Sequence, residues 1–249
     1  MLEKNPTISA AKQKVIDDLL KDLPTDTAIE VELPSENRVY KLEDPAAAIT
    51  LRPMTFEDEK HIVSAGKGQD PINLILQRCS TNINISDLLP LDKLYLIMKL
   101  REISYGDIYN ALLICTHCGG ENPADIKLSE LNVNPVPDDF TDPTEAFLPT
   151  LKKKVKIKYP RVRDEKLFQN IEEGMSQLWR FVEEVDGHTE KAIISKVIPQ
   201  LPLKDAHTLM ETMGAAKYGL DTRVRFVCNY CDHNEIMELP ITADFFTGK

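Results

Sequence analysis

The 249-residue sequence lacks most of the features that mark enzymes, membrane proteins and exported proteins. No apolar run approaches the roughly 18 residues that a membrane-spanning helix needs, so we expect no membrane partner. The first residues do not combine a basic region with an apolar stretch, which predicts that no secretory signal is present. With only 10 glycines, the chain has no phosphate-binding glycine loop, nucleophile elbow or metal-hydrolase helix motif. We therefore expect a protein that is not an enzyme, and we assign no catalytic residue.

The sequence also lacks a surplus of positive charge, because its net charge is −10. A general nucleic-acid-binding protein needs a basic field, so the composition argues against that class. One stretch differs, since residues 152–163 hold seven basic residues and no acid. Lys154, Lys156 and Lys158 alternate with apolar residues there, which is the period of a half-buried strand. A solvated strand face is the simpler interpretation, and a binding patch for phosphate or an acidic partner is the alternative.

Four of the five cysteines stand in two Cys-x-x-Cys pairs that more than one hundred residues separate. Without an export signal we expect a reducing compartment, where such pairs indicate metal ligands rather than disulfides. Four thiolates suit one zinc ion in a tetrahedral, closed and therefore structural site. We predict one structural Zn²⁺ per chain and no other cofactor, with these ligands: Cys115, Cys118, Cys228 and Cys231. The ion would join two remote parts of the chain.

The remaining candidate ligands have simpler explanations. Cys79 falls within an apolar helical pattern, so we expect a small core residue there. His117 and His233 lie in or beside the cysteine pairs, but four cysteines already complete a tetrahedral site.

The two cysteine pairs share their sequence context, which predicts two tandem pseudo-repeats. Each pair follows a strand that ends at a proline, a helix that opens with Leu-Pro-Leu, and a Tyr-Gly turn. These features stand at 49–51 and 155–157, at 89–91 and 201–203, and at 105–106 and 218–219. The Tyr-Gly turn begins ten residues before the first cysteine in both copies. The order of elements is the same in both copies.

Within each unit we predict an α+β arrangement of strand, helices and a β-hairpin whose tip is the Cys-x-x-Cys knuckle. Two such hairpins would complete a split four-cysteine zinc ribbon. Thr55 and Asp58 resemble a capping box at the start of a helix. The expected helices span 72–79, 91–103, 167–182 and 192–197, and the expected hairpin strands span 109–114, 124–128, 222–227 and 235–239.

The sequence predicts four segments. Residues 1–25 form an N-terminal helix, with an amphipathic pattern over 8–23. Residues 26–131 form the first repeat, which includes a β-hairpin at 28–42 and the first zinc knuckle. Residues 132–149 are rich in proline and acids, which is typical of a linker. Residues 150–249 form the second repeat with the second zinc knuckle.

Two groups of motifs resemble the baseplate hub protein family of T-even-type contractile-tailed bacteriophages. One is ITLRPMTFEDEK at 49–60, and the other combines LDKLYL at 91–96, LREISYGD at 100–107 and CTHCG at 115–119. The resemblance extends from about residue 28 to 240. Of the functional residues, only the four cysteines carry over, as metal ligands.

The resemblance implies a non-enzymatic structural or assembly protein of the tail baseplate hub. Its partners would be other phage hub and tail proteins. It would be made in the host bacterial cytoplasm during assembly and, as a hub subunit, would stay in the virion tail. The alternative is a zinc-ribbon nucleic-acid-binding or transcription accessory protein, for which residues 152–163 are the best evidence. The sequence leaves the oligomeric state open.

Overall fold

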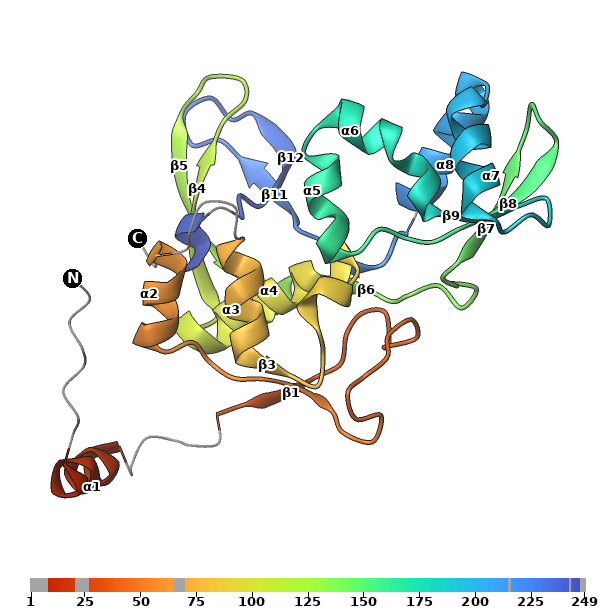
Figure 1. Cartoon of the computed structure of the whole chain (residues 1–249). Coiled ribbons are helices and arrows are strands. Elements are labelled where there is room, and N and C mark those ends of the chain that lie inside the picture. The colour runs from red at the N-terminus through yellow and green to blue at the C-terminus, as the bar shows by residue number, and fades with distance from the viewer. Residues whose placement is uncertain (1–8, 21–26, 65–69, 215, 242, 247–249) are drawn as a thin grey trace.

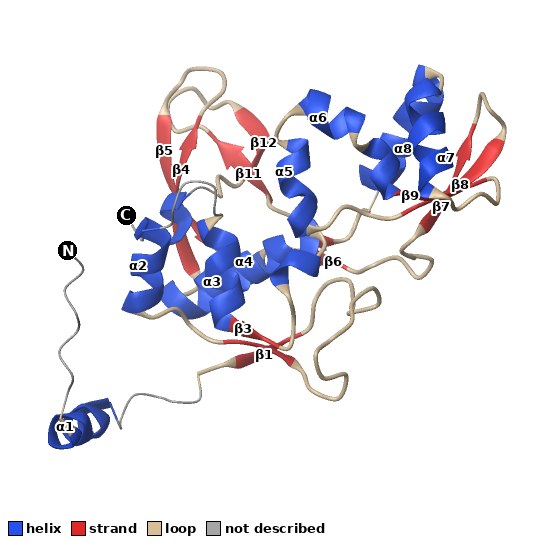
Figure 2. Cartoon of the chain, viewed as in Figure 1, coloured by secondary structure: helices blue, strands red, loops and turns tan. Residues whose placement is uncertain are grey.

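The computed structural model describes residues 9–20, 27–64, 70–214, 216–241 and 243–246. The chain forms both helices and antiparallel strands, which confirms the predicted α+β class (Figures 1 and 2). The first helix, α1 (Ala10–Leu20), lies within the predicted segment 8–23, whose ends fall outside the described residues. In the part of the chain that the structure describes, no helix is both long and apolar enough to cross a lipid bilayer.

The first part of the chain forms an antiparallel sheet and three helices. The sheet has β2 (Ile49–Leu51) in the middle, between β1 (Ile29–Val31) and β3 (Ser80–Thr81). The hairpin predicted at 28–42 is therefore wrong, because β1 pairs with β2 instead. Ser35 explains the difference: its backbone N–H donates to the Asp92 carboxylate at 3.1 Å, and the chain turns over residues 34–39 rather than forming a second strand.

Two helices of this part lie close to their predicted ranges of 72–79 and 91–103, and a third begins at the predicted capping box. Thr55 and Asp58 form the expected capping box at α2 (Phe56–Ser64), with Thr55 N donating to Asp58 Oδ2 at 3.0 Å. The next helix is α3 (Pro71–Cys79), and the long helix is α4 (Pro90–Tyr105). Gly106 follows α4 with φ of 93°, a conformation that glycine adopts without steric cost.

The middle of the chain forms a second sheet of the same order. Strand β8 (Lys153–Ile157) lies between β7 (Thr144–Leu148) and β9 (Val182–Val185), and all pairs are antiparallel. Strand β7 and the short β6 (Val133–Asn134) both lie within 132–149, the segment expected to be a linker. This segment therefore contributes paired strands, and its Leu148 is fully buried.

The single helix predicted over 167–182 is wrong. The chain forms α5 (Glu165–Phe168), α6 (Ile171–Ser176), a 3₁₀ turn at Leu178–Phe181, and then β9. Phe181 decides the outcome, because its side chain is buried and its carbonyl accepts the backbone N–H of Lys158 at 2.8 Å. Burial beside β8 outweighs the helical period, and Gly174 weakens the helix further.

Two helices and two hairpins complete the fold. The helices are α7 (Lys191–Val197), close to its predicted range, and α8 (Leu203–Gly214). One hairpin joins β4 (Ile108–Ile114) to β5 (Glu121–Lys127), and the other joins β11 (Arg223–Val227) to β12 (Asn234–Glu238), close to the predicted positions. Between them in sequence, β10 (Gly219–Leu220) pairs with β6. Figure 1 shows the two hairpins side by side, far from α7 and α8.

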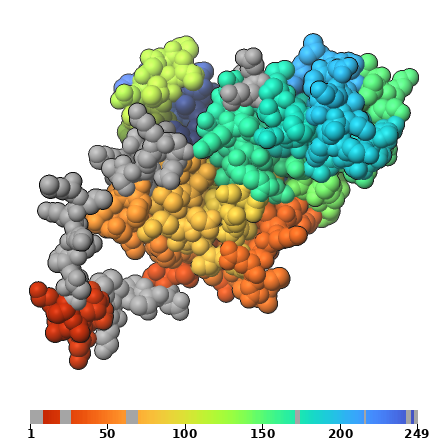
Figure 3. All heavy atoms as spheres, in the orientation of Figure 1, coloured from red at the N-terminus to blue at the C-terminus, as the bar shows by residue number. Residues whose placement is uncertain are grey.

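Buried apolar residues form two large clusters. The first cluster extends from Val31 to Phe246 and includes α3, α4, both hairpins and the C-terminal 3₁₀ turn. All members of the second cluster lie between Ala146 and Met213. A smaller group of buried residues includes Leu89, Phe140 and Tyr218. Each large cluster marks one region of the molecule, the first region around the first cluster and the second region around the second. In Figure 3 the teal atoms of the second region lie against the yellow and orange atoms of the first.

Candidate metal centre

The alternation of side chains along the hairpin strands brings the cysteines inward. In β4, Tyr109, Ala111 and Leu113 are buried while their neighbours are exposed. Because strand side chains alternate with period two, Cys115 continues this inward series. Phe226 and Cys228 are inward in the same way at the end of β11. Both hairpins therefore direct the first cysteine of their knuckle toward the other hairpin.

The two knuckles have equivalent backbone hydrogen bonds. In the first, Gly119 N donates to Cys115 O at 2.9 Å, and in the second, Asp232 N donates to Cys228 O at 3.0 Å. Gly119 and Asp232 both have positive φ, of 72° and 56°. Glycine adopts this conformation freely, and aspartate is among the other residues that tolerate it. Each turn thus presents its two sulfurs on the same side.

The four predicted ligands lie together at the meeting point of the hairpins. Sγ of Cys115 is 3.8 Å from Sγ of Cys231, and Sγ of Cys118 is 3.6 Å from Sγ of Cys228. All four sulfurs lie within 4.8 Å of one another. A tetrahedral ion with metal–sulfur bonds of about 2.3 Å would require sulfurs about 3.8 Å apart. The donor set and its spacing therefore fit a four-thiolate metal site.

Hydrogen bonds near Cys228 favour its thiolate form. Tyr230 N donates to its Sγ at 3.4 Å, and Asn122 Nδ2 does so at 3.7 Å. Burial opposes ionisation, but the backbone N–H groups of Tyr230 and Cys231 outweigh it and lower the pKa of the Cys228 thiol. A thiolate is the form that binds a metal ion.

The residues that were considered and not chosen as ligands, Cys79, His117 and His233, lie outside the four-sulfur group. The rings of His117 and His233 stack beside the knuckles, with their centroids 5.3 Å apart. Cys79 is buried in α3 within the first cluster, as predicted for a core residue. Burial raises the pKa of the Cys79 thiol to about 11, which disfavours reactivity.

Two residues that contact the knuckles were missed by sequence reasoning. Asn122 is 3% exposed, and its Oδ1 accepts the backbone N–H of Asn229 in the opposite knuckle at 2.8 Å. Glu235 accepts from Thr116 in the first knuckle. The available signal was positional, since each residue stands seven places after the first cysteine of its own hairpin.

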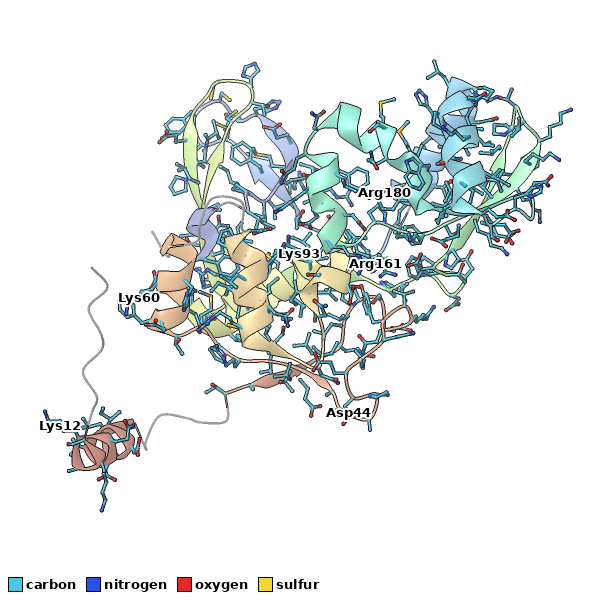
Figure 4. The ribbon with its side chains drawn as sticks, in the orientation of Figure 1. Lys12, Asp44, Lys60, Lys93, Arg161 and Arg180 are labelled. Carbon is cyan, nitrogen blue, oxygen red and sulfur yellow. The ribbon has the colours of Figure 1, made fainter. Side chains whose placement is uncertain are left out.

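Charged side chains join the two regions away from the cysteines. Lys93 of α4 donates to Glu165 of α5 at 2.8 Å and to Asp70 at 3.4 Å. Arg161 is ion-paired with Asp142, and its guanidinium lies over the ring of Tyr40 in the first region, 5.5 Å from the ring centroid. Figure 4 shows Lys93 and Arg161 in the middle of the molecule, between the first region and the second. These contacts connect the two regions and have a structural role. The four cysteines are therefore the candidate functional site.

The basic stretch at 152–163 is electrically balanced by acids. Six of its seven basic residues form ion pairs: Lys153 with Asp186, Lys154 with Glu145, Lys156 with Glu184, Lys158 with Glu183, Arg161 with Asp142 and Arg163 with Asp87. Several of these pairs join neighbouring strands of the second sheet. The pattern agrees with a solvated strand face.

The sequence matches the model of one protein family. The family is described as T4 bacteriophage base plate protein, and the match covers residues 26–247. Comparison with curated proteins and with solved structures gave no match. The matched region contains both hairpins and all four cysteines, whereas α1 precedes it. Because the match covers most of the chain, the protein belongs to the T4 bacteriophage base plate protein family.

Proposed function

We propose that this chain is a non-enzymatic structural or assembly protein of the phage tail baseplate hub, stabilised by one structural zinc ion. The observation that carries the proposal is the four-cysteine cluster, which brings together two hairpins more than ninety residues apart in a baseplate-family chain. A site closed by four thiolates has no open position for a substrate, so its metal serves the fold. Zinc is the usual ion for such a donor set.

The zinc ion would act as a link between distant segments. Metal binding to structural cysteine sites contributes on the order of 10 kcal/mol to folding. Here that free energy would hold β11 and β12 against β4 and β5, more than one hundred residues away in sequence. Such a link suits a rigid component that other tail proteins contact.

The proposal includes the tandem duplication, with β7 as the first strand of the second unit. Both three-stranded sheets have the same strand order, and Leu33-Pro34-Ser35 after β1 matches Leu148-Pro149-Thr150 at the end of β7. Asp92 of α4 accepts the backbone N–H of Ser35, and Asp205 of α8 accepts that of Thr150 at 2.8 Å. A buried aspartate of the long helix thus holds the same loop in both units.

The ion pairs of the basic stretch argue against the alternative function, a zinc-ribbon nucleic-acid-binding or transcription accessory protein. Its evidence was the stretch at 152–163, and six of the seven basic residues there are ion-paired with acids of this chain. Paired charges release few counterions on binding to phosphate, so they supply little affinity.

Metal analysis tests the zinc part of the proposal. Native mass spectrometry should find one zinc ion per chain, and Cys118→Ser and Cys231→Ser should each lose it. Cys79→Ala is the matched control, because Cys79 is buried in α3 and should leave the zinc content unchanged. Full zinc content in either knuckle variant would overturn the shared site.

Partner capture tests the baseplate part. The tagged full-length chain, expressed during phage infection, should recover hub and tail proteins that mass spectrometry can identify. We expect these partners in the host cytoplasm during assembly, and the chain itself in purified virions if it is a hub subunit. Recovery of no tail protein from infected cells would contradict the proposed role.

A further inference from the structure

Each knuckle is held by a side chain from the opposite hairpin. Asn122 and Glu235 occupy the same position, seven residues after Cys115 and Cys228 respectively. Each accepts the backbone N–H of the residue that follows the first cysteine of the other knuckle, Asn229 or Thr116. The two contacts are reciprocal, and both run between hairpins from remote parts of the chain.

Asn122 makes three contacts at the junction. Its Oδ1 accepts from Asn229 N at 2.8 Å, and its Nδ2 donates to Gly120 O at 2.8 Å. The same Nδ2 lies 3.7 Å from Sγ of Cys228 and donates to it. The amide is buried, so these contacts are shielded from water. It ties the turn of its own knuckle to the backbone and sulfur of the other.

Glu235 makes the corresponding contact to the other knuckle through its charged carboxylate. Its Oε1 accepts from Thr116 N at 3.3 Å, and both carboxylate oxygens accept from Thr116 Oγ1 at 2.9 Å. A carboxylate can only accept here, so Glu235 offers no hydrogen bond to a sulfur. Its negative charge lies against Thr116, the neighbour of the ligand Cys115, with Nε2 of His233 3.9 Å from its Oε1.

We propose that Asn122 and Glu235 are a reciprocal pair of positioning residues that hold the two knuckles at metal-binding distance. This inference rests on the proposed zinc site and adds what sets its geometry and charge. The two residues differ in effect. Asn122 aligns the hairpins and donates to Cys228 Sγ, which stabilises the thiolate. Glu235 aligns the hairpins only, and its charge weakens the site.

Metal-binding measurements on the full-length chain test this division. Zinc affinity is measured by competition with a chelator, and Co²⁺ substitution reports the sulfur ligands through its absorption spectrum. Loss of an outer contact to a metal ligand costs about 10–100-fold in affinity, and we expect this for Asn122→Ala. Asn122→Asp keeps the oxygen that accepts from Asn229 but removes the donor to sulfur, so it should weaken binding at least as much and shift the Co²⁺ charge-transfer band.

The Glu235 variants should give a different pattern. Glu235→Ala removes the contact to Thr116 and should weaken zinc binding about 10-fold. Glu235→Gln keeps an accepting oxygen without the charge, so it should bind at least as tightly as the unmodified chain. Asn110→Ala is the matched control, because this exposed amide on β4 donates to Asp125 of its own hairpin.

Three outcomes separate the possibilities. If the unmodified chain gives no thiolate–Co²⁺ spectrum, the zinc proposal itself fails. If that spectrum is present but Asn122→Ala behaves like Asn110→Ala, the positioning role is wrong. If Glu235→Gln lowers zinc affinity as much as Glu235→Ala does, the assigned charge effect is wrong. Circular dichroism of each variant at saturating zinc excludes simple unfolding, since a folded variant with a shifted Co²⁺ band still supports the inference.

Discussion

The two large buried clusters differ in how far along the chain they gather their residues. The second cluster is local, since its members lie between Ala146 and Met213. The first begins at Val31 and needs Phe245 and Phe246 from the opposite end of the sequence. Closing so long a loop costs conformational entropy, and a cross-link that closes it adds stability. The candidate metal centre lies in the cluster that needs this link, because Cys115 and Cys228 belong to it.

The largest expected effect comes from removing the metal. Chelation should expose the amides of both hairpins to hydrogen exchange, at 108–127 and 223–238, because zinc binding supplies on the order of 10 kcal/mol to sites of this kind. The amides of β8 and α8, in the second region, should stay protected for longer. Mass spectrometry of exchange with and without chelator measures both. Simultaneous loss of protection in the two regions would show that the clusters unfold as one unit.

A matched pair of leucines tests the same difference by mutation. Leu96 of α4 and Leu209 of α8 are both fully buried, one in each cluster. Replacing either with alanine should cost about 2–5 kcal/mol of unfolding free energy, measured with urea. Leu96→Ala should also speed zinc loss to a chelator, because its cluster contains two of the ligands. Leu209→Ala should not, and an equal rate in both variants would contradict the separation.

The features that the sequence predicted are those that local chemistry determines. The hairpins follow from alternating strands around each Cys-x-x-Cys turn, and α4 follows from Pro90 at its start and Gly106 at its end. The helix expected over 167–182 and the hairpin over 28–42 were wrong because distant contacts decide those segments. Phe181 is buried beside β8, and Ser35 bonds to Asp92 of α4.

The candidate site was predictable in its ligands but not in its surroundings. Cysteine spacing is a local signal, so all four ligands could be named from the sequence. Asn122 and Glu235 lie on strands, where an amide or a carboxylate is common at exposed positions. Their roles depend on how one hairpin packs on the other, and no local pattern specifies that contact.

Two buried aspartates, one in each region, should contribute to folding stability with opposite dependence on pH. Burial raises the pKa of Asp92, whereas at Asp205 the N–H groups of Thr150 and Leu151 outweigh burial and lower its pKa. The folded state therefore binds the Asp92 proton more tightly than the unfolded state, and the Asp205 proton less tightly. Relative to Asp92→Asn, the unmodified chain should gain stability as pH falls from 7 toward about 4.

For Asp205→Asn, the stability difference from the unmodified chain should change with pH in the opposite direction. Its lowered folded pKa stabilises the protein above the unfolded value of about 3.9, so the advantage of the unmodified chain should hold from pH 7 to 4 and shrink below it. Urea unfolding at several pH values between 3 and 7 measures both differences. Parallel pH profiles for the two variants would mean that the two carboxyl groups have the same environment.

The smallest effect is expected on the exposed face of β8. Lys154 is 76% exposed and lies 3.7 Å from Glu145, so Lys154→Ala should change the unfolding free energy by less than about 0.5 kcal/mol. Arg161 is the control from the same basic stretch, because only 14% of its side chain is exposed. Its replacement by alanine leaves the buried carboxylate of Asp142 without its partner and should cost about 3 kcal/mol. Urea unfolding compares them, and a large loss at Lys154 would give its ion pair a structural role that its exposure argues against.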